Sequence, residues 1–179
     1  MKNTLCLAAL LALAGCQKLV DPSPASTLTA TVSGEPDYVA QSFPDGFSNF
    51  FSDADTSAAP GCLNLFSQSG NTYLSLRVCK FRGVGTYAIR AIPASTGRTS
   101  HAYYEWDSNT SVWVYDTQYL LPVGSVVGQV VVSSYDPASH HVQGTFRFAG
   151  TQFSLPGQPA GTLTQVSNGR FDIYGLVIR

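Results

Sequence analysis

Charge is scarce in this chain of 179 residues: 12% of them are charged, and the formal net charge is −1. A composition so poor in charge differs from that of intrinsically disordered chains. The basic residues are scattered and form no run, which argues against nucleic acid as a partner. Stretches with helical periodicity are missing as well. Threonine, serine, valine, tyrosine and phenylalanine are plentiful instead, a composition typical of strands and turns.

Signatures of catalysis are also missing. No Gly-x-Ser-x-Gly turn is present to expose a nucleophile, and no glycine-rich loop is present to hold phosphate. Glu35 and Glu105 are the only glutamates, so no carboxylate pair is singled out for acid–base chemistry. His140 and His141 are adjacent, and neighbouring side chains of a strand point to opposite faces, so they chelate together only if the turn bends there. We therefore expect neither an enzyme nor a cofactor or metal site.

The longest apolar run, residues 5–14, is too short for a membrane span, which takes about 20 residues. It follows Lys2 and ends in the sequence Leu13–Cys16, Leu-Ala-Gly-Cys, which has the form of a bacterial lipobox. We therefore predict a lipoprotein signal peptide over residues 1–15 and a lipid on Cys16. Ordinary secretory cleavage near the same place is the alternative.

Residues 16–27 are expected to form a flexible tether because they contain two prolines and several small polar residues. The residue after Cys16 is Gln17 and not aspartate, which favours sorting to the outer membrane. Lys18, Leu19 and Val20 come next, which departs from the acidic signals for surface export. The predicted location is therefore the cell envelope, in the outer membrane and on its periplasmic side, with the membrane as a partner through the lipid.

Residues 28–179 are predicted to form one all-β domain. Short runs of alternating apolar residues recur between turn signals, which favours a single antiparallel β-sandwich, with an up-and-down, lipocalin-like β-barrel as the alternative. Residues 43–61 form a longer connection with room for a short helix at 47–51. The expected strands are 27–33, 37–42, 62–67, 72–79, 84–91, 101–107, 111–116, 125–135, 140–149, 161–165 and 170–178.

A first hairpin can be assigned a register from its turn. If Gly70 and Asn71 form a two-residue loop, counting outward brings Cys62 opposite Cys79. Facing Cβ atoms lie about 4.5–5.5 Å apart, which is close enough for a disulfide after small adjustment. Export favours such a pair, and two unpaired buried thiols are the alternative. The same register places the leucines of both strands on one face, with Phe66 on the other.

Two further hairpins follow. A turn at Asn109 and Thr110 places four rings on one face, where they form either core or a ligand-binding platform, because flat ligands stack on such rings. These four rings belong to Tyr104, Trp106, Trp113 and Tyr115.

The third hairpin turns at residues 136–139, and we expect His140 to share a face with Val142, Phe146 and Phe148.

The order of these elements resembles a group of small Bacteroidota-type outer-membrane lipoproteins that carry a β-rich domain of unknown function. The resemblance covers about residues 28–179 and rests on strand and turn signatures. It implies no activity and no catalytic residue. The stretches that carry it are Gly85–Tyr87, Gly128–Asp136, Gly144–Phe148 and Val166–Phe171.

Two classes of function follow from the sequence. The first is a non-catalytic, lipid-anchored envelope lipoprotein with a structural or partner-binding role. The second is a module that binds a glycan or another small ligand through the aromatic hairpin face. The expected partner is accordingly an envelope protein or a glycan.

Overall fold

The computed structural model describes residues 24–41, 51–54, 61–91, 100–108, 111–117, 122, 124–154 and 158–178. Within these residues the chain forms strands and turns and no α-helix, which confirms the all-β fold class. The strands are β1 (Thr27–Val32), β2 (Tyr38–Gln41), β3 (Phe51–Ala54), β4 (Cys62–Ser69), β5 (Thr72–Cys79), β6 (Gly85–Arg90), β7 (His101–Ser108), β8 (Ser111–Asp116), β9 (Val126–Asp136), β10 (His141–Ser154), β11 (Gln158–Tyr174) and β12 (Val177–Ile178).

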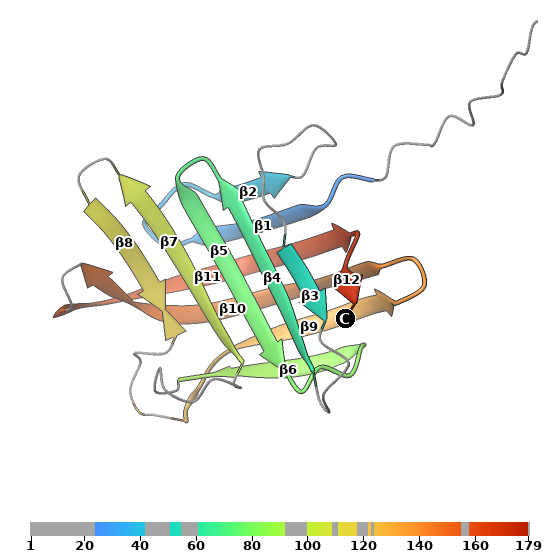
Figure 1. The fold of residues 1–179 in the computed structure, drawn as a ribbon. Helices are drawn as coiled ribbons and strands as arrows, with labels where there is room; N and C mark the ends of the chain where they lie inside the picture. Colours follow the sequence, from blue (N-terminus) through green and yellow to red (C-terminus); the bar gives the residue numbers. More distant parts are fainter. Residues whose placement is uncertain are drawn as a thin grey trace, which may run out of the picture.

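These strands belong to one hydrogen-bonded sheet that is nearly closed into a barrel (Figure 1). The front layer of Figure 1 contains β3, β4, β5, β7 and β8, and the back layer contains β6, β9, β10, β11, β1 and β2. Strand β10 connects the layers, because its first part pairs with β9 and residues 151–154 pair with β8. The pairings described are antiparallel, except that of the short β12 with β3. The fold thus has the layers of a sandwich and the nearly continuous sheet of a barrel.

The β4–β5 hairpin has the predicted register. Ser69 pairs with Thr72 across the turn, and Cys62 pairs with Cys79, where the Sγ atoms lie at disulfide distance and the Cα atoms are 4.1 Å apart. Gly70 has a φ of 58°, a left-handed conformation that glycine adopts at little cost. The apolar side chains predicted for the core are all at most 2% exposed: Leu63, Leu65, Leu74, Leu76 and Val78.

The β7–β8 hairpin also has its predicted register, since Tyr104 pairs with Tyr115 and Trp106 with Trp113. The β9–β10 turn differs in one respect. His140 has a φ of 55° and lies in the turn, so it does not share a strand face with Val142 as expected. Strand β10 begins at His141, which pairs with Asp136.

Two expectations about strand boundaries were wrong. Phe51, placed at the end of a short helix, begins strand β3 and pairs with Phe66; the rest of that expected helix lies outside the described residues. The strands expected at 161–165 and 170–178 belong largely to one strand, β11, which ends at Tyr174. The Asn-Gly pair between them makes a bulge and not a hairpin turn: Asn168 has a φ of 51°, and β11 has one extra residue there relative to both neighbours.

Glycines of the back layer make room for phenylalanine rings. Gly144 pairs with Phe171, and Gly169 pairs with Phe146, across β10 and β11. A Cβ atom on either glycine would overlap the ring opposite it. The two rings stack at 6.5 Å between centroids and are at most 3% exposed. Glycine is therefore required here for space and not for its backbone freedom.

Candidate functional site

The predicted aromatic hairpin face points inward at its described rings. Tyr104 is 2% exposed and Tyr115 is 6% exposed, and their rings stack at 5.9 Å between centroids. The side chains of Trp106 and Trp113 lie outside the described part of the chain. Tyr104 and Tyr115 are thus core residues, while ligand binding by the whole four-ring face stays a prediction.

The buried tyrosines cluster at one end of the fold. Tyr38 packs edge-on against Tyr104, with centroids 6.1 Å apart, and its hydroxyl lies 2.8 Å from Ser67 Oγ. Burial, and after it the nearby carboxylate of Glu35, raise the pKa of Tyr104 to about 12. Burial also raises the pKa of Tyr38 and Tyr115. A hollow of about 160 Å³ between Glu35, Tyr38 and Tyr104 opens at this end.

The opposite, outward side of the front layer carries a second set of rings, belonging to Phe66, Tyr73 and Tyr103, which we call the outer aromatic face. All three side chains are half-buried. Phe66 and Tyr73 stack at 6.0 Å between centroids. Ser75 pairs with Phe66 on one side and with Tyr103 on the other, so a small residue separates these two rings.

Polar groups surround the outer aromatic face. Gln68 donates a hydrogen bond from Nε2 to the Tyr73 hydroxyl at 3.0 Å. Glu105 pairs with Tyr73 on the next strand, and its pKa is raised by burial and then by the charge of Asp107. Burial and the Glu105 carboxylate raise the pKa of Tyr103. Partly exposed rings beside amide and carboxylate groups are typical of surfaces that bind other proteins or sugar rings.

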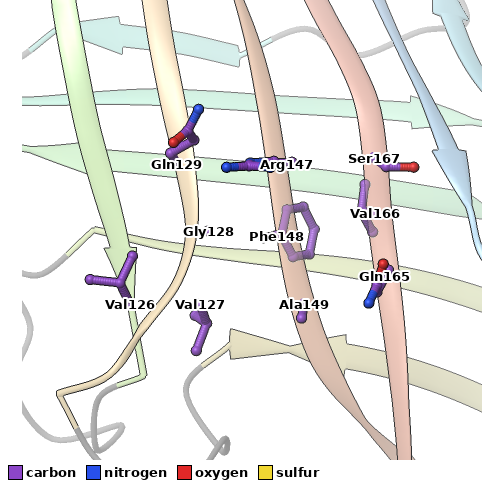
Figure 2. Close-up of a pocket in the computed structure, with 10 residues that line it drawn as sticks. All are labelled: Val126, Val127, Gly128, Gln129, Arg147, Phe148, Ala149, Gln165, Val166 and Ser167. Atoms are coloured by element: carbon purple, nitrogen blue, oxygen red, sulfur yellow. The ribbon is translucent and has the colours of Figure 1, made fainter.

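The outward side of the back layer has a hollow of about 380 Å³ (Figure 2). Strands β9, β10 and β11 line it. Its polar side chains include Gln129, Arg147 and Gln165, and Gln129 faces Arg147 across β9 and β10. Val127 and Ala149 add apolar area. The hollow is shallow and open, so it suits a ligand that contacts the surface better than one that is enclosed.

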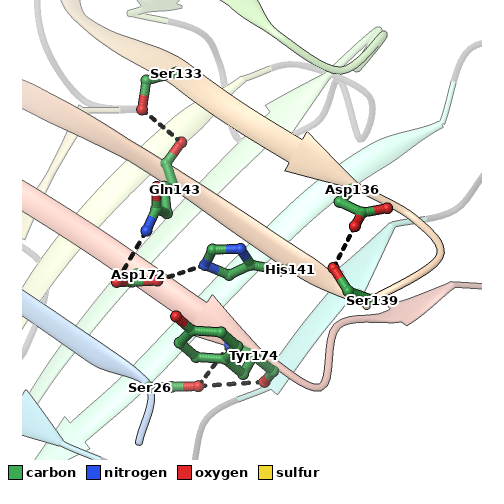
Figure 3. A network of polar contacts seen from close by, with 8 residues as sticks. All are labelled: Ser26, Ser133, Asp136, Ser139, His141, Gln143, Asp172 and Tyr174. Atoms are coloured by element: carbon green, nitrogen blue, oxygen red, sulfur yellow. Dashed lines mark hydrogen bonds and ion pairs between the residues drawn. The ribbon is translucent and has the colours of Figure 1, made fainter. Parts of the chain in front are cut away.

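A polar network lies on the same side of the back layer (Figure 3). His141 Nε2 is 2.6 Å from Asp172 Oδ1, and Gln143 donates to Asp172 Oδ2 at 3.1 Å. The His141 ring stacks on Tyr174 with centroids 4.1 Å apart. Tyr174 in turn donates its backbone N–H to Ser26 Oγ at 2.8 Å. These contacts join β10, β11 and the segment before β1, so the network has a structural role.

The two adjacent histidines have separate partners. His140 Nδ1 lies 2.6 Å from the Leu176 carbonyl, and the Leu176 N–H donates to the His140 carbonyl at 2.9 Å. His141 binds Asp172 instead. Among the residues described, no group of three or more histidine, cysteine, aspartate or glutamate side chains is arranged to hold a metal ion.

The predicted signal peptide, lipidated Cys16 and most of the tether lie outside the described residues, so these assignments stay predictions. In the part of the chain that is described, no helix is long and apolar enough to cross a membrane.

Sequence reasoning missed the outer aromatic face although its signal was present. The hairpin register already placed Phe66 on the side opposite the leucines, and the alternation within residues 101–107 separates Tyr103 from Tyr104. What the sequence does not contain is the pairing of β5 with β7, which brings Tyr73 and Tyr103 into one surface.

Comparison with known proteins finds no protein-family model, no curated protein and no solved structure that matches this chain.

Proposed function

We propose that this chain is a lipid-anchored protein of the cell envelope whose β-domain binds a partner protein without catalysis. In this proposal a lipid on Cys16 holds the domain at the periplasmic side of the outer membrane, as the Leu-Ala-Gly-Cys sequence and the resemblance to Bacteroidota-type lipoproteins suggest. The anchor would confine the domain to a surface, where a partner is met at high local concentration.

The observation that carries the binding role is the outer aromatic face. Phe66, Tyr73 and Tyr103 keep part of their ring area in solvent, although the core beneath them is filled by the leucines of β4 and β5. Aromatic residues are enriched at protein interfaces, and tyrosine is among the residues that most often dominate binding energy there. A folded core does not require these rings to face outward, so recognition explains them better than stability does.

Glycan binding by the same face is the second candidate function. Sugars stack their apolar side on tyrosine or phenylalanine rings and bond their hydroxyls to neighbouring polar groups. Gln68 and Glu105 supply an amide and a carboxyl group beside Tyr73.

One pair of variants tests the binding face. The full chain and its Tyr103→Ser variant would be compared in a pull-down from solubilised envelope and on a glycan array, with Thr145→Ser on the exposed back layer as the control. We expect Tyr103→Ser to lose the partner and Thr145→Ser to keep it. Loss of a protein band supports the main proposal, and loss of array binding supports the second. Equal binding by both variants contradicts both.

The anchor has its own test. Cys16→Ala should abolish incorporation of labelled fatty acid, whereas Cys6→Ala, which changes a cysteine within the predicted leader, should leave it intact. Incorporation that survives Cys16→Ala would contradict the lipidated position.

A further inference from the structure

Among the described strands, β6 has a neighbour on one side only over most of its length. It pairs with β9 from Gly85 to Arg90, and it runs along the lower border of the molecule in Figure 1. Hydrogen-bonding groups of successive residues in a strand point alternately to its two sides. The side that faces away from β9 is therefore reached by every second residue.

Two hydrogen bonds identify the residues of β6 whose backbone groups point away from β9. The Ala91 N–H donates to the Ser125 carbonyl at 2.9 Å, on the β9 side, whereas the Arg90 N–H donates to the Ser100 carbonyl at 3.5 Å, on the opposite side. By alternation, the N–H and C=O groups of Ala88 and Thr86 also point away from β9. Within the described residues, no backbone hydrogen bond joins either group to another segment on that side.

A hollow of about 320 Å³ lies along this free edge. Thr86, Ala88 and Arg90 line it from β6, and Lys80 and Ser100 line it from the neighbouring segments. Thr86, Ala88 and Arg90 are exposed. Ser100 is held in place because its hydroxyl accepts a hydrogen bond from the Cys79 N–H at 3.0 Å, next to the disulfide.

The charge along the hollow has one sign. Lys80 and Arg90 are its two charged lining residues in the described part of the chain, and both are cationic. Arg90 also donates from its guanidinium to the Gly124 carbonyl at 2.9 Å, on the β9 side. Lys80 has a φ of 59°, an uncommon conformation for a residue other than glycine, directly after Cys79. Two cations beside a free strand edge favour an anionic occupant.

We propose that the free edge of β6 binds an extended, acidic segment of a partner protein as an added β-strand. The backbone groups of Thr86 and Ala88 would pair with the segment, while Lys80 and Arg90 would bind carboxylates on alternate residues. A second copy of this chain suits the edge less well, because its β6 would bring further positive charge. This inference rests on the proposed partner-binding role, but it uses a different surface from the outer aromatic face.

The test uses two short capped peptides and the full chain. In one peptide threonine alternates with glutamate, and in the other lysine replaces each glutamate. Amide hydrogen exchange by NMR should slow about tenfold or more at Thr86 and Ala88 when the glutamate peptide is added. The lysine peptide should bind at least about tenfold more weakly.

Variants separate the edge from other cationic sites. Lys80→Glu should weaken binding of the glutamate peptide about tenfold, and Arg147→Glu, the same charge change on the outward side of β10, should not. Ala88→Pro removes one outward N–H and should also abolish binding; its circular dichroism spectrum shows whether the sheet is intact. Because Lys80→Glu leaves the β6 backbone unchanged, the test does not depend on the proline variant folding.

Three results would overturn the inference. They are unchanged exchange at Thr86 and Ala88 in saturating glutamate peptide, equal binding of both peptides, and a concentration-dependent dimer that itself protects these two amides. Tyr103→Ser distinguishes this inference from the proposed function, because it should leave the glutamate peptide bound. If the peptide fails while the aromatic face still captures its partner, only the strand-edge proposal is lost.

Discussion

The two layers of the sheet fill their common core in different ways. The β4–β5 hairpin contributes a regular row of aliphatic side chains, such as Leu74 and Leu76, and a disulfide joins its ends. Strands β10 and β11 contribute the large rings of Phe146 and Phe171, each opposite a glycine. In the front layer alternation alone specifies which residues pack. In the back layer packing depends on matched pairs that lie far apart in the sequence.

The largest effect is expected in the front layer. Leu76→Ala should lower the free energy of unfolding by about 2–5 kcal/mol, because the fully buried side chain leaves a cavity between the layers. Urea unfolding followed by circular dichroism measures this. Leu163→Ala is the matched control, because Leu163 is 56% exposed. Equal losses for both variants would contradict the assignment of Leu76 to the core.

The disulfide should contribute somewhat less. It closes a loop between residues separated by 17 positions, and constraining a loop of this size in the unfolded chain is worth roughly 3 kcal/mol. We expect the double variant Cys62→Ser with Cys79→Ser to lose about this much stability in urea. Reductant should destabilise the wild-type chain similarly and leave the double variant unchanged. A thiol assay that finds both cysteines free in the oxidised protein would contradict the pairing.

The glycine–phenylalanine pairs predict a smaller loss of stability, part of which a second substitution should restore. Gly169→Ala should destabilise the chain by about 1–3 kcal/mol, because the added methyl overlaps the Phe146 ring. Adding Phe146→Leu should restore part of that loss, so the two substitutions are coupled in a double-mutant cycle. Thr145→Ala, at the exposed residue next to Phe146, is the control for a surface change on β10. Additive effects of the two core substitutions would contradict direct contact.

The same difference explains how far the sequence predicts the fold. The β4–β5 and β7–β8 registers follow from short turns, so Cys62 opposite Cys79 and Tyr104 opposite Tyr115 were predicted and found. Residues 166–169 were expected to lie between two strands, whereas Asn168 forms a bulge within β11, because its left-handed φ fits a bulge as well as a turn. Only its two neighbouring strands, β1 and β10, show that the chain continues as one strand.

The binding surfaces were less predictable for a related reason. The sequence shows that Tyr103 and Tyr104 point to opposite sides, but not which side is core. The four rings of the hairpin were expected to form either core or a platform, and the ring of Tyr104 is buried against Tyr38 from the other layer. The free edge of β6 was invisible, because strand order across a sheet comes from tertiary pairing.

The contact of Tyr38 with Tyr104 joins the two layers. Ionisation of these tyrosine hydroxyls gives the smallest expected effect on stability. Burial raises the pKa of both hydroxyls above the ordinary value of about 10, that of Tyr104 to about 12. Between these values the folded chain keeps protons that the unfolded chain releases. Stability is therefore fully present below about pH 10 and falls as the pH rises toward 12.

Removing the Tyr104 hydroxyl should make this loss of stability smaller. Tyr104→Phe should reduce the loss of stability between pH 9 and pH 11 by roughly 1 kcal/mol, since phenylalanine releases no proton. Urea unfolding of the wild type and the variant at both pH values measures the difference, and the same pair at pH 7 separates lost packing and hydrogen bonding from titration. Parallel pH profiles for the two proteins would contradict a proton held at Tyr104, and with it the burial of this contact between the layers.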